Sequence, residues 1–460
     1  MVFLSTSFES FADAIVWKTL AQIFIIATAM LLGNTLRRKI GFIKRSLIPT
    51  SLLGGLFILI LKFIPQFKEL INEDFMEIIT YHSLGIGFIA LSLKTAKTQQ
   101  KTSTKQVVET GLLTGAIYLT QATLGLLVTI GIAYFALYEI IPGAGVLLAL
   151  GFGQGTGQAL NYGLLYENDF GFTGGATFGL TIATVGFIVS SVVGVTYMNI
   201  LKSKGKLRRA DENEGVEEKL ADYVSENEIP NTESVDKLTI NLCLILVVYG
   251  IVYFIMKLVG VNLIWGFNFL LGSIIAILFR QVFKFLKKHN IMHRELTNNN
   301  LLDRISGFMF DVMIIAGVAA IDLTELSTLV IPILIICTLG TVFTFIYIRK
   351  ACNILYPGYE NEMFFAMFGM LTGTASNGMI LLREVDPKFE TPAATNLVLQ
   401  NMPAIAFGGA ILLVLGYCPK GMFEACVTLG IVFTALVIYT FIIFRSKIFK
   451  GKKKKSNEKR

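Results

Sequence analysis

Long apolar runs dominate this chain, and each is about as long as one membrane crossing. A bilayer core of about 30 Å needs roughly 20 apolar residues in one helix. Within a bilayer only helices and closed barrels satisfy their own backbone polar groups, so the runs predict an all-α polytopic membrane protein with about 11 transmembrane helices. The predicted crossings are residues 16–36, 47–64, 75–93, 111–137, 173–201, 238–259, 263–283, 302–321, 326–348, 393–418 and 422–444.

The composition excludes a soluble globule. Hydrophobic residues make up 54% of the 460 residues and charged residues 16%, against about 25% charged in soluble domains. Residues 202–237 and 445–460 carry 27 of the 72 charged side chains, which is typical of a membrane body with polar appendages. The net charge of +8 comes without a basic face interleaved with aromatic residues, so no nucleic-acid partner is predicted.

Two further apolar segments, residues 143–165 and 362–382, are interrupted at their centres by glycine and polar residues. If both segments are re-entrant, 35 of the 40 Lys and Arg residues fall on one face of the membrane. The positive-inside rule then predicts an external N-terminus and a cytoplasmic C-terminus. If either segment crossed fully, basic loops would move outside, which favours the re-entrant interpretation.

The two halves of the chain also repeat. At an offset of 218, Gly155 and Thr156 align with Gly373 and Thr374, and each half reads as four spans, a broken segment and a fifth span. Because five is odd, the second half is inverted, a construction typical of secondary transporters. The predicted units are residues 1–201 and 238–418 as two inverted five-span repeats, 202–237 as a charged cytoplasmic linker, and 419–460 as an extra span with a basic tail that attracts anionic membrane lipid.

The broken segments are the predicted binding site. Their glycines let the backbone leave the helix, and inside a membrane such backbone belongs in a protein-lined or water-filled cavity. Carbonyl, hydroxyl and amide oxygens suit a small cation, while a half-helix N-terminus offers N–H donors to a carboxylate. Glycines that merely allow close helix packing are the alternative, but they do not explain the Gln, Asn and Thr between them.

Further polar residues lie on neighbouring spans. Asp311 is an intramembrane acid that could ligate sodium or carry a coupling proton. Arg383 could pair with a substrate carboxylate or serve as a cytoplasmic anchor. The predicted sodium ligands are Gln158, Thr372, Ser376, Asn401 and Asp311. The predicted substrate-binding residues are Gln154, Gly155, Thr156, Gly157, Asn161, Thr374, Asn377, Arg383, Asn396 and Gln400.

The run GVLLALGFGQGTGQALNYG, followed by FTGGATFGLTIATVGFIVSSVVG, resembles the glycine-rich re-entrant motif and following span of the bacterial sodium/glutamate symporters. TGTASNG with LLREVDP is similar to the second motif in more distant members. The resemblance implies sodium-coupled uptake of an anionic amino acid, both loops forming the site, and a homodimer. It departs from the family at Gln154, where the glutamate carriers have a histidine, in a shorter second glycine series and in the extra C-terminal span.

The sequence therefore predicts a secondary active transporter in the bacterial inner membrane, with Na⁺ as coupling ion, no cofactor, and glutamate or a related anionic amino acid or carboxylate as substrate. Alternating access, elevator-like, would move the unit bearing both loops against the other spans. The alternatives are a proton-coupled carboxylate carrier, or a cation or anion channel or uniporter that uses the loops as a filter. An enzyme is not predicted, because no nucleophile motif, metal-ligand set or phosphate-binding loop is present.

Overall fold

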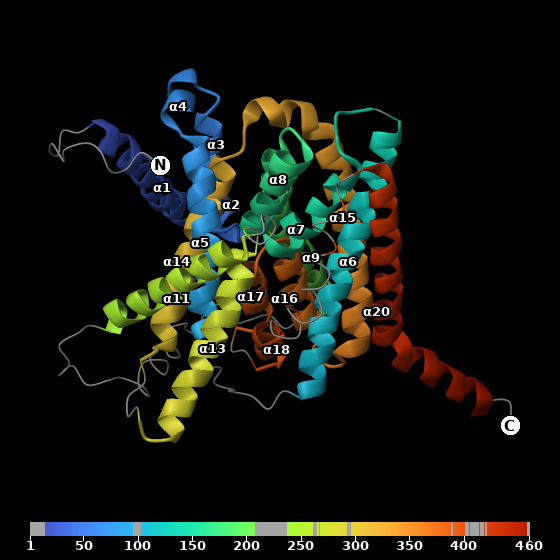
Figure 1. Ribbon diagram of the computed structural model, residues 1–460. Helices are drawn as coiled ribbons and strands as arrows, with labels where there is room; N and C mark the ends of the chain where they lie inside the picture. The colour runs from blue at the N-terminus through green and yellow to red at the C-terminus, as the bar shows by residue number, and fades with distance from the viewer. Residues whose placement is uncertain are drawn as a thin grey trace.

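The computed structural model describes the chain as a bundle of helices (Figure 1). No strand occurs in the part of the chain that it describes, as predicted for an all-α membrane protein. The described residues are 14–94, 103–135, 137–207, 237–260, 265, 267–291, 296–387, 390–400, 404, 414, 418 and 421–457. Most of the predicted linker and most of residues 401–420, including Asn401, lie outside these ranges.

The first half of the chain contains four long helices and several short ones. Its elements are α1 (Ala14–Lys39), α2 (Gly41–Ser46), α3 (Thr50–Leu61), α4 (Pro65–Leu70), α5 (Glu73–Leu93), α6 (Thr104–Tyr134), η1 (Pro142–Val146), α7 (Leu147–Gln154), α8 (Thr156–Phe170) and α9 (Gly175–Ser203). Among the described residues, the second half contains five long helices and three short ones. Its elements are α11 (Lys237–Val259), α13 (Asn268–Lys288), α14 (Asn299–Ala319), α15 (Leu323–Leu355), α16 (Glu360–Thr372), α17 (Ala375–Val385), α18 (Ala393–Leu399) and α20 (Met422–Asn457).

Eight described helices are long and apolar enough to cross a membrane, which is consistent with a multi-pass membrane protein: α1, α5, α6, α9, α11, α13, α15 and α20. The prediction of a crossing at residues 47–64 was too long. The helix there spans only Thr50–Leu61, roughly 18 Å at 1.5 Å per residue, because Pro49 precedes it and Pro65 starts α4. Helix α14 is also 21 residues long, but its three charged residues, Asp303, Arg304 and Asp311, keep it out of this set of eight.

The helices form two groups. In the first group, α5 packs along α14 at the centre, α3 and α1 contact one side of this pair, and α13 and α11 contact the other. In the second group, α6, α15 and α9 surround the short helices α7, α8, α16 and α17, and α20 packs outside α6 (Figure 1). The two broken segments therefore lie together in one group.

A close crossing of backbones fixes one broken segment against α6. A Cβ atom on Gly125 of α6 would lie 1.8 Å from the carbonyl oxygen of Gly145 in η1, and the reverse contact is equally tight. Thr129 stabilises the same crossing, because its Oγ1 donates to the Pro142 carbonyl at 2.7 Å and accepts from the Gly145 N–H at 3.1 Å. Only glycine fits at this point on either element.

We expect Gly125→Ala to lower the free energy of unfolding by about 1–3 kcal/mol or more, because the methyl group must push two backbones apart. Gly131→Ala on the same helix is the matched control, since a Cβ atom at Gly131 would have nothing within 4 Å. That control should be neutral, or stabilising by up to about 1 kcal/mol from helix propensity. Thermal unfolding in detergent checks both variants, and equal melting temperatures would contradict the close crossing.

Candidate functional site

The first broken segment is a helical hairpin. Its first arm, α7, runs along α6 from the Gly125 crossing to Gly153, whose carbonyl accepts from the Tyr118 hydroxyl at 3.2 Å. Its second arm, α8, returns along α9, where the Glu167 carboxylate accepts from the Ala176 N–H at 3.2 Å. The turn is at Gly155, with φ +81° and ψ −169°, a conformation that side chains other than glycine rarely adopt.

The second broken segment is also a helical hairpin, formed by α16 and α17. A Cβ atom on Gly369 of α16 would lie 2.7 Å from Gly378 Cα, so the two arms touch through glycine. The chain turns at Gly373 and Thr374. Thr374 then caps α17, because its Oγ1 accepts from the Asn377 N–H at 3.4 Å.

The two hairpin tips meet inside the second helix group. A Cβ atom on Gly155 would lie 3.5 Å from Thr374 Cγ2 and 3.8 Å from the Gly373 carbonyl oxygen. Helices α8 and α17 both begin at this contact, so two sets of free N–H groups and two positive helix ends point to one region. Together they favour a negatively charged group there.

Buried polar side chains accompany the tips. Gln158 in the first turn of α8 is 1% exposed, and neither its amide nitrogen nor its amide oxygen has a partner among the described residues. The Thr156 hydroxyl donates to the Met313 carbonyl of α14 at 3.4 Å. An unpartnered buried amide is costly, which is a physical reason to expect a ligand or water beside Gln158.

Most of the residues predicted to bind substrate or sodium lie at or beside these tips. On the first hairpin Gly155 and Gly157 are buried, Gln154 is half-buried, and Asn161 lies one turn further along α8. On the second hairpin Asn377 is buried and donates through Nδ2 to Ser190 Oγ at 3.5 Å. Thr372 is buried with its hydroxyl donating to the Phe368 carbonyl at 2.7 Å, and Ser376 is exposed.

Four predicted site residues lie elsewhere. Arg383 is exposed near the far end of α17, roughly 13 Å along the helix from Thr374. Asn396 donates to the Tyr359 hydroxyl at 3.3 Å. Gln400 accepts from the Thr114 hydroxyl at 2.8 Å and donates to Met370 Sδ at 3.2 Å, so it contacts α16 about one turn before the second tip. The sequence spacing indicated their helix but not the face that contacts α6 and α16.

Asp311 is the fourth. It lies beside the Ser51 hydroxyl of α3, whereas the α14 residues that contact Thr156 and Gly157 are Met313 and Gly317. Residues 311 and 313 differ by about 200° around a helix, so Asp311 points away from the hairpins. Asp311 is therefore not placed to bind an ion at the hairpin tips.

Sequence reasoning missed three residues that hold the tips. Gln121 of α6 is fully buried and donates through Nε2 to the Leu371 carbonyl at 2.8 Å and to Thr344 Oγ1 at 3.1 Å. Ser190 donates to the Gly369 carbonyl at 3.4 Å, and the Tyr118 hydroxyl donates to the Gly153 carbonyl. A single amide within the long apolar run at residues 111–137 was the available signal for Gln121.

The chemistry of the tips suits an alkali cation better than a transition metal. Within the described ranges, no group of three or more His, Cys, Asp or Glu side chains could hold a metal ion. Residues 143–165 and 362–382 contain neither Lys nor Arg. Any cation at the tips would therefore be held by carbonyl, hydroxyl and amide oxygens, and any carboxylate by backbone N–H groups, side-chain amide and hydroxyl donors, and the cation.

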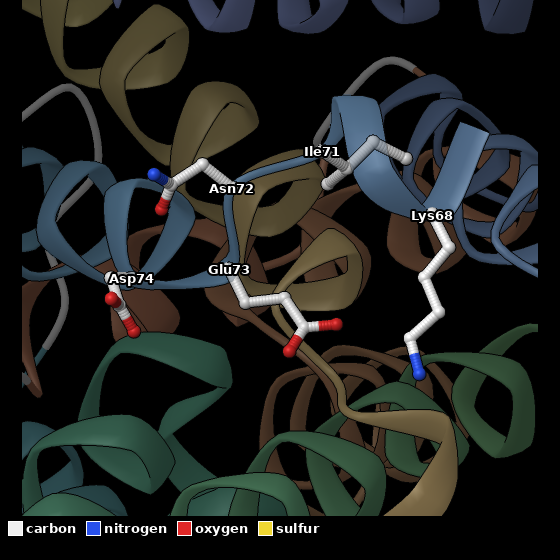
Figure 2. Close-up of a pocket in the computed structure, with 5 residues that line it drawn as sticks. All are labelled: Lys68, Ile71, Asn72, Glu73 and Asp74. Atoms are coloured by element: carbon white, nitrogen blue, oxygen red, sulfur yellow. The ribbon is translucent and has the colours of Figure 1, made fainter. Parts of the chain in front are cut away.

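A separate open pocket lies at the start of α5, away from the tips (Figure 2). Lys68, Ile71, Asn72, Glu73 and Asp74 line it. In Figure 2 the side chains of Lys68 and Glu73 extend toward the same side, whereas Asn72 points away from them. None of these residues belongs to either broken segment.

The model of the sodium/glutamate symporter family matches residues 15–369 of the chain. The chain belongs to this family. It is thus a sodium-coupled membrane transporter, and the match includes the whole first hairpin and α16 up to Gly369. The second tip, α17 and α20 follow the matched region in this family member. A search of curated proteins found no match to the chain.

We expect Gln121→Leu to destabilise the protein by about 1–3 kcal/mol, because the Leu371 carbonyl beside the second tip loses a buried hydrogen-bond donor. Thr123→Val, two residues further on, is the control, since the buried Thr123 hydroxyl has no partner among the described residues. Thermal unfolding of the two purified variants measures the difference. A Thr123→Val loss as large as that of Gln121→Leu would contradict the role given to Gln121.

Proposed function

We propose that this protein takes up glutamate or a related anionic amino acid or carboxylate together with Na⁺, by alternating access. The meeting of two glycine-rich hairpin tips inside the protein carries the proposal. Polar backbone without a helical partner is expensive in a membrane and is kept where it lines a binding cavity. Membership of the family supports the sodium coupling. The meeting of the tips supports the place where ion and substrate would bind.

The tips offer complementary groups to the two solutes. Sodium would bind oxygens near Gln158, Thr156, Thr372 and Ser376, and the substrate carboxylate would bind the N-termini of α8 and α17. A bound cation beside a bound carboxylate lowers the cost of burying either charge. This mutual stabilisation is the physical basis of the proposed coupling.

The arrangement of the helices supports alternating access. The main contacts between the two helix groups are those of α8 with α5 and α14, and of α9 with α14 and α2. Both hairpins lie in one group, so that group could carry ion and substrate together past the α5–α14 pair. Gly157 faces this boundary, where a Cβ atom would meet Leu84 and Met313.

The proposal also covers the internal repeat, the membrane topology and the oligomeric state of the protein. The pairing of α3 with α14 and of α13 with α5 supports two inverted repeats with units at residues 1–201 and 238–418. The basic loops support a re-entrant path for both hairpins, an external N-terminus and a cytoplasmic C-terminus in a bacterial inner membrane. A homodimer is proposed from the family resemblance.

Proteoliposomes test the transport claim directly. A membrane potential supplies about 2.3 kcal/mol per charge per 100 mV, so two net charges would support accumulation by over roughly a thousandfold. We expect an inward sodium gradient to drive uptake of radiolabelled glutamate, aspartate or a dicarboxylate against its own gradient. Uptake that never exceeds equilibrium would favour a channel or uniporter, and uptake driven only by a pH gradient would favour a proton-coupled carrier.

Binding measurements on variants place the ion. We expect Thr156→Val and Ser376→Ala to reduce the sodium-dependent rise in melting temperature, because each removes an oxygen at a tip. Thr123→Val should leave the rise unchanged, with choline replacing sodium as the reference condition. Equal losses in all three variants would contradict a sodium site at the tips.

A further inference from the structure

A buried lysine holds the end of α14. Lys62, directly after α3, is 2% exposed, and its Nζ donates to the carbonyls of Ala319 at 3.0 Å and Ile321 at 2.6 Å. The same Nζ forms an ion pair with Glu73, the first residue of α5. The last carbonyls of a helix have no partner within the helix, and a cation there also interacts favourably with the helix dipole.

An arginine makes the corresponding contact at the other end of the α5–α14 pair. Arg280 of α13 donates through Nη1 to the carbonyl of Lys94 at 2.7 Å, and Lys94 is the residue that caps the C-terminus of α5. Lys94 in turn pairs with Asp303 near the start of α14. At each end of the pair, a cation therefore contacts the C-terminus of one helix, and an acidic residue lies near the N-terminus of the other helix.

The two cations occupy matching positions of the repeat. Residues 62 and 280 differ by 218, the offset that relates Gly155 to Gly373. In both cases the cation lies on or directly after the helix that packs beside the central helix of the other half, α3 or α13, and it holds the C-terminus of that central helix, α14 or α5. A chance contact would not be expected to recur at the same offset.

Both contacts lie where the chain passes from one helix group to the other. After Ile321 the chain enters α15 through Asp322, and after Lys94 it continues toward α6. Asp322 caps α15, accepting from the N–H groups of Thr324 at 2.6 Å and Glu325 at 3.4 Å. Burial alone would raise the pKa of Asp322, but these hydrogen bonds and the charge of Lys68 outweigh it and lower the pKa.

We propose that Lys62 and Arg280 are positioning residues that anchor two of the three connections between the helix groups, so that the hairpin-bearing group moves about two fixed points. This inference rests on the proposed alternating access. The anchors hold the first-group end of each connection, while Asp322 on the far side donates its N–H to Thr177 of α9 at 3.1 Å. At the α14 connection a single residue, Asp322, separates Ile321 from α15, so movement there is confined to the backbone around Asp322.

The anchors would act on the rate of the conformational change and not on binding at the tips. Neither Lys62 nor Arg280 belongs to a hairpin, and their hydrogen bonds go to the ends of α5 and α14. Removing one cation leaves carbonyl groups, and for Lys62 also Glu73, without their charged partner. The connection should then open locally while the ion and substrate site stays intact.

The test measures transport in proteoliposomes for Lys62→Met and Arg280→Met. We expect each to lower the maximal rate of sodium-driven uptake by roughly tenfold, about 1.4 kcal/mol in activation free energy, with the KM for substrate unchanged. Lys62→Arg and Arg280→Lys keep a cationic donor and should retain most of the rate. Lys257→Met, an exposed lysine in the last turn of α11, is the control and should behave as wild type.

Hydrogen exchange gives a second readout that does not depend on transport. Lys62→Met should speed amide exchange at Ile321 and Asp322, and Arg280→Met should speed it at the end of α5, whereas Lys257→Met should change neither. Faster exchange with an unchanged uptake rate would overturn the positioning role. A rate loss accompanied by an equal loss of sodium-dependent thermal stabilisation would also overturn it, because the damage would then have reached the tips.

The two readouts separate this inference from the proposed function. If wild-type protein shows no sodium-driven uptake, the proposed function fails and the transport role of the anchors fails with it. The exchange experiment then still decides whether Lys62 and Arg280 hold the two connections. Unchanged exchange in both methionine variants would contradict the anchors themselves.

Discussion

The contact between Gly155 and the Gly373–Thr374 turn is the feature on which the rest of the structure depends. It brings the free N–H groups of two helices together inside an apolar protein, where unsatisfied polar groups are expensive. Neighbouring side chains reduce this cost by hydrogen bonding: Gln121, Tyr118 and Ser190 donate to carbonyls that lie before the two turns. What stays available is an anion-favouring region between two helix ends, next to oxygen groups that suit a small cation.

That region lies in one of the two helix groups and borders the central α5–α14 pair of the other group. The central pair α5 and α14 is held at both ends by charge, with Lys62 at one end and Arg280 at the other. The hairpins contact this pair mainly through α8, at glycine and small side chains such as Gly157 and Gly317. A central pair held at both ends, beside a boundary that includes glycine, is compatible with the proposed sliding movement and links the proposed anchors to the proposed transport cycle.

Much of the fold could be predicted from the sequence, because membrane helices are recognisable as long apolar runs. The broken segments were also predictable, since glycine with Gln, Asn and Thr has no reason to interrupt an apolar helix unless the backbone turns there. The contacts of single side chains were not. Asp311 looked like an ion ligand from its depth alone, but the helix turns it toward Ser51. Lys62 lay within the predicted crossing at residues 47–64, and only its contact with the end of α14, far away in sequence, shows its role.

The central claim is that sodium binds where the two hairpin tips meet, and hydrogen exchange measured in sodium and in choline tests it most directly. The account predicts that sodium slows amide exchange at residues 155–158 and 374–378 together, because one ion would order both tips, while exchange in α11 and α13 stays the same. Protection of only one tip, or protection confined to residues around Asp311, would contradict it.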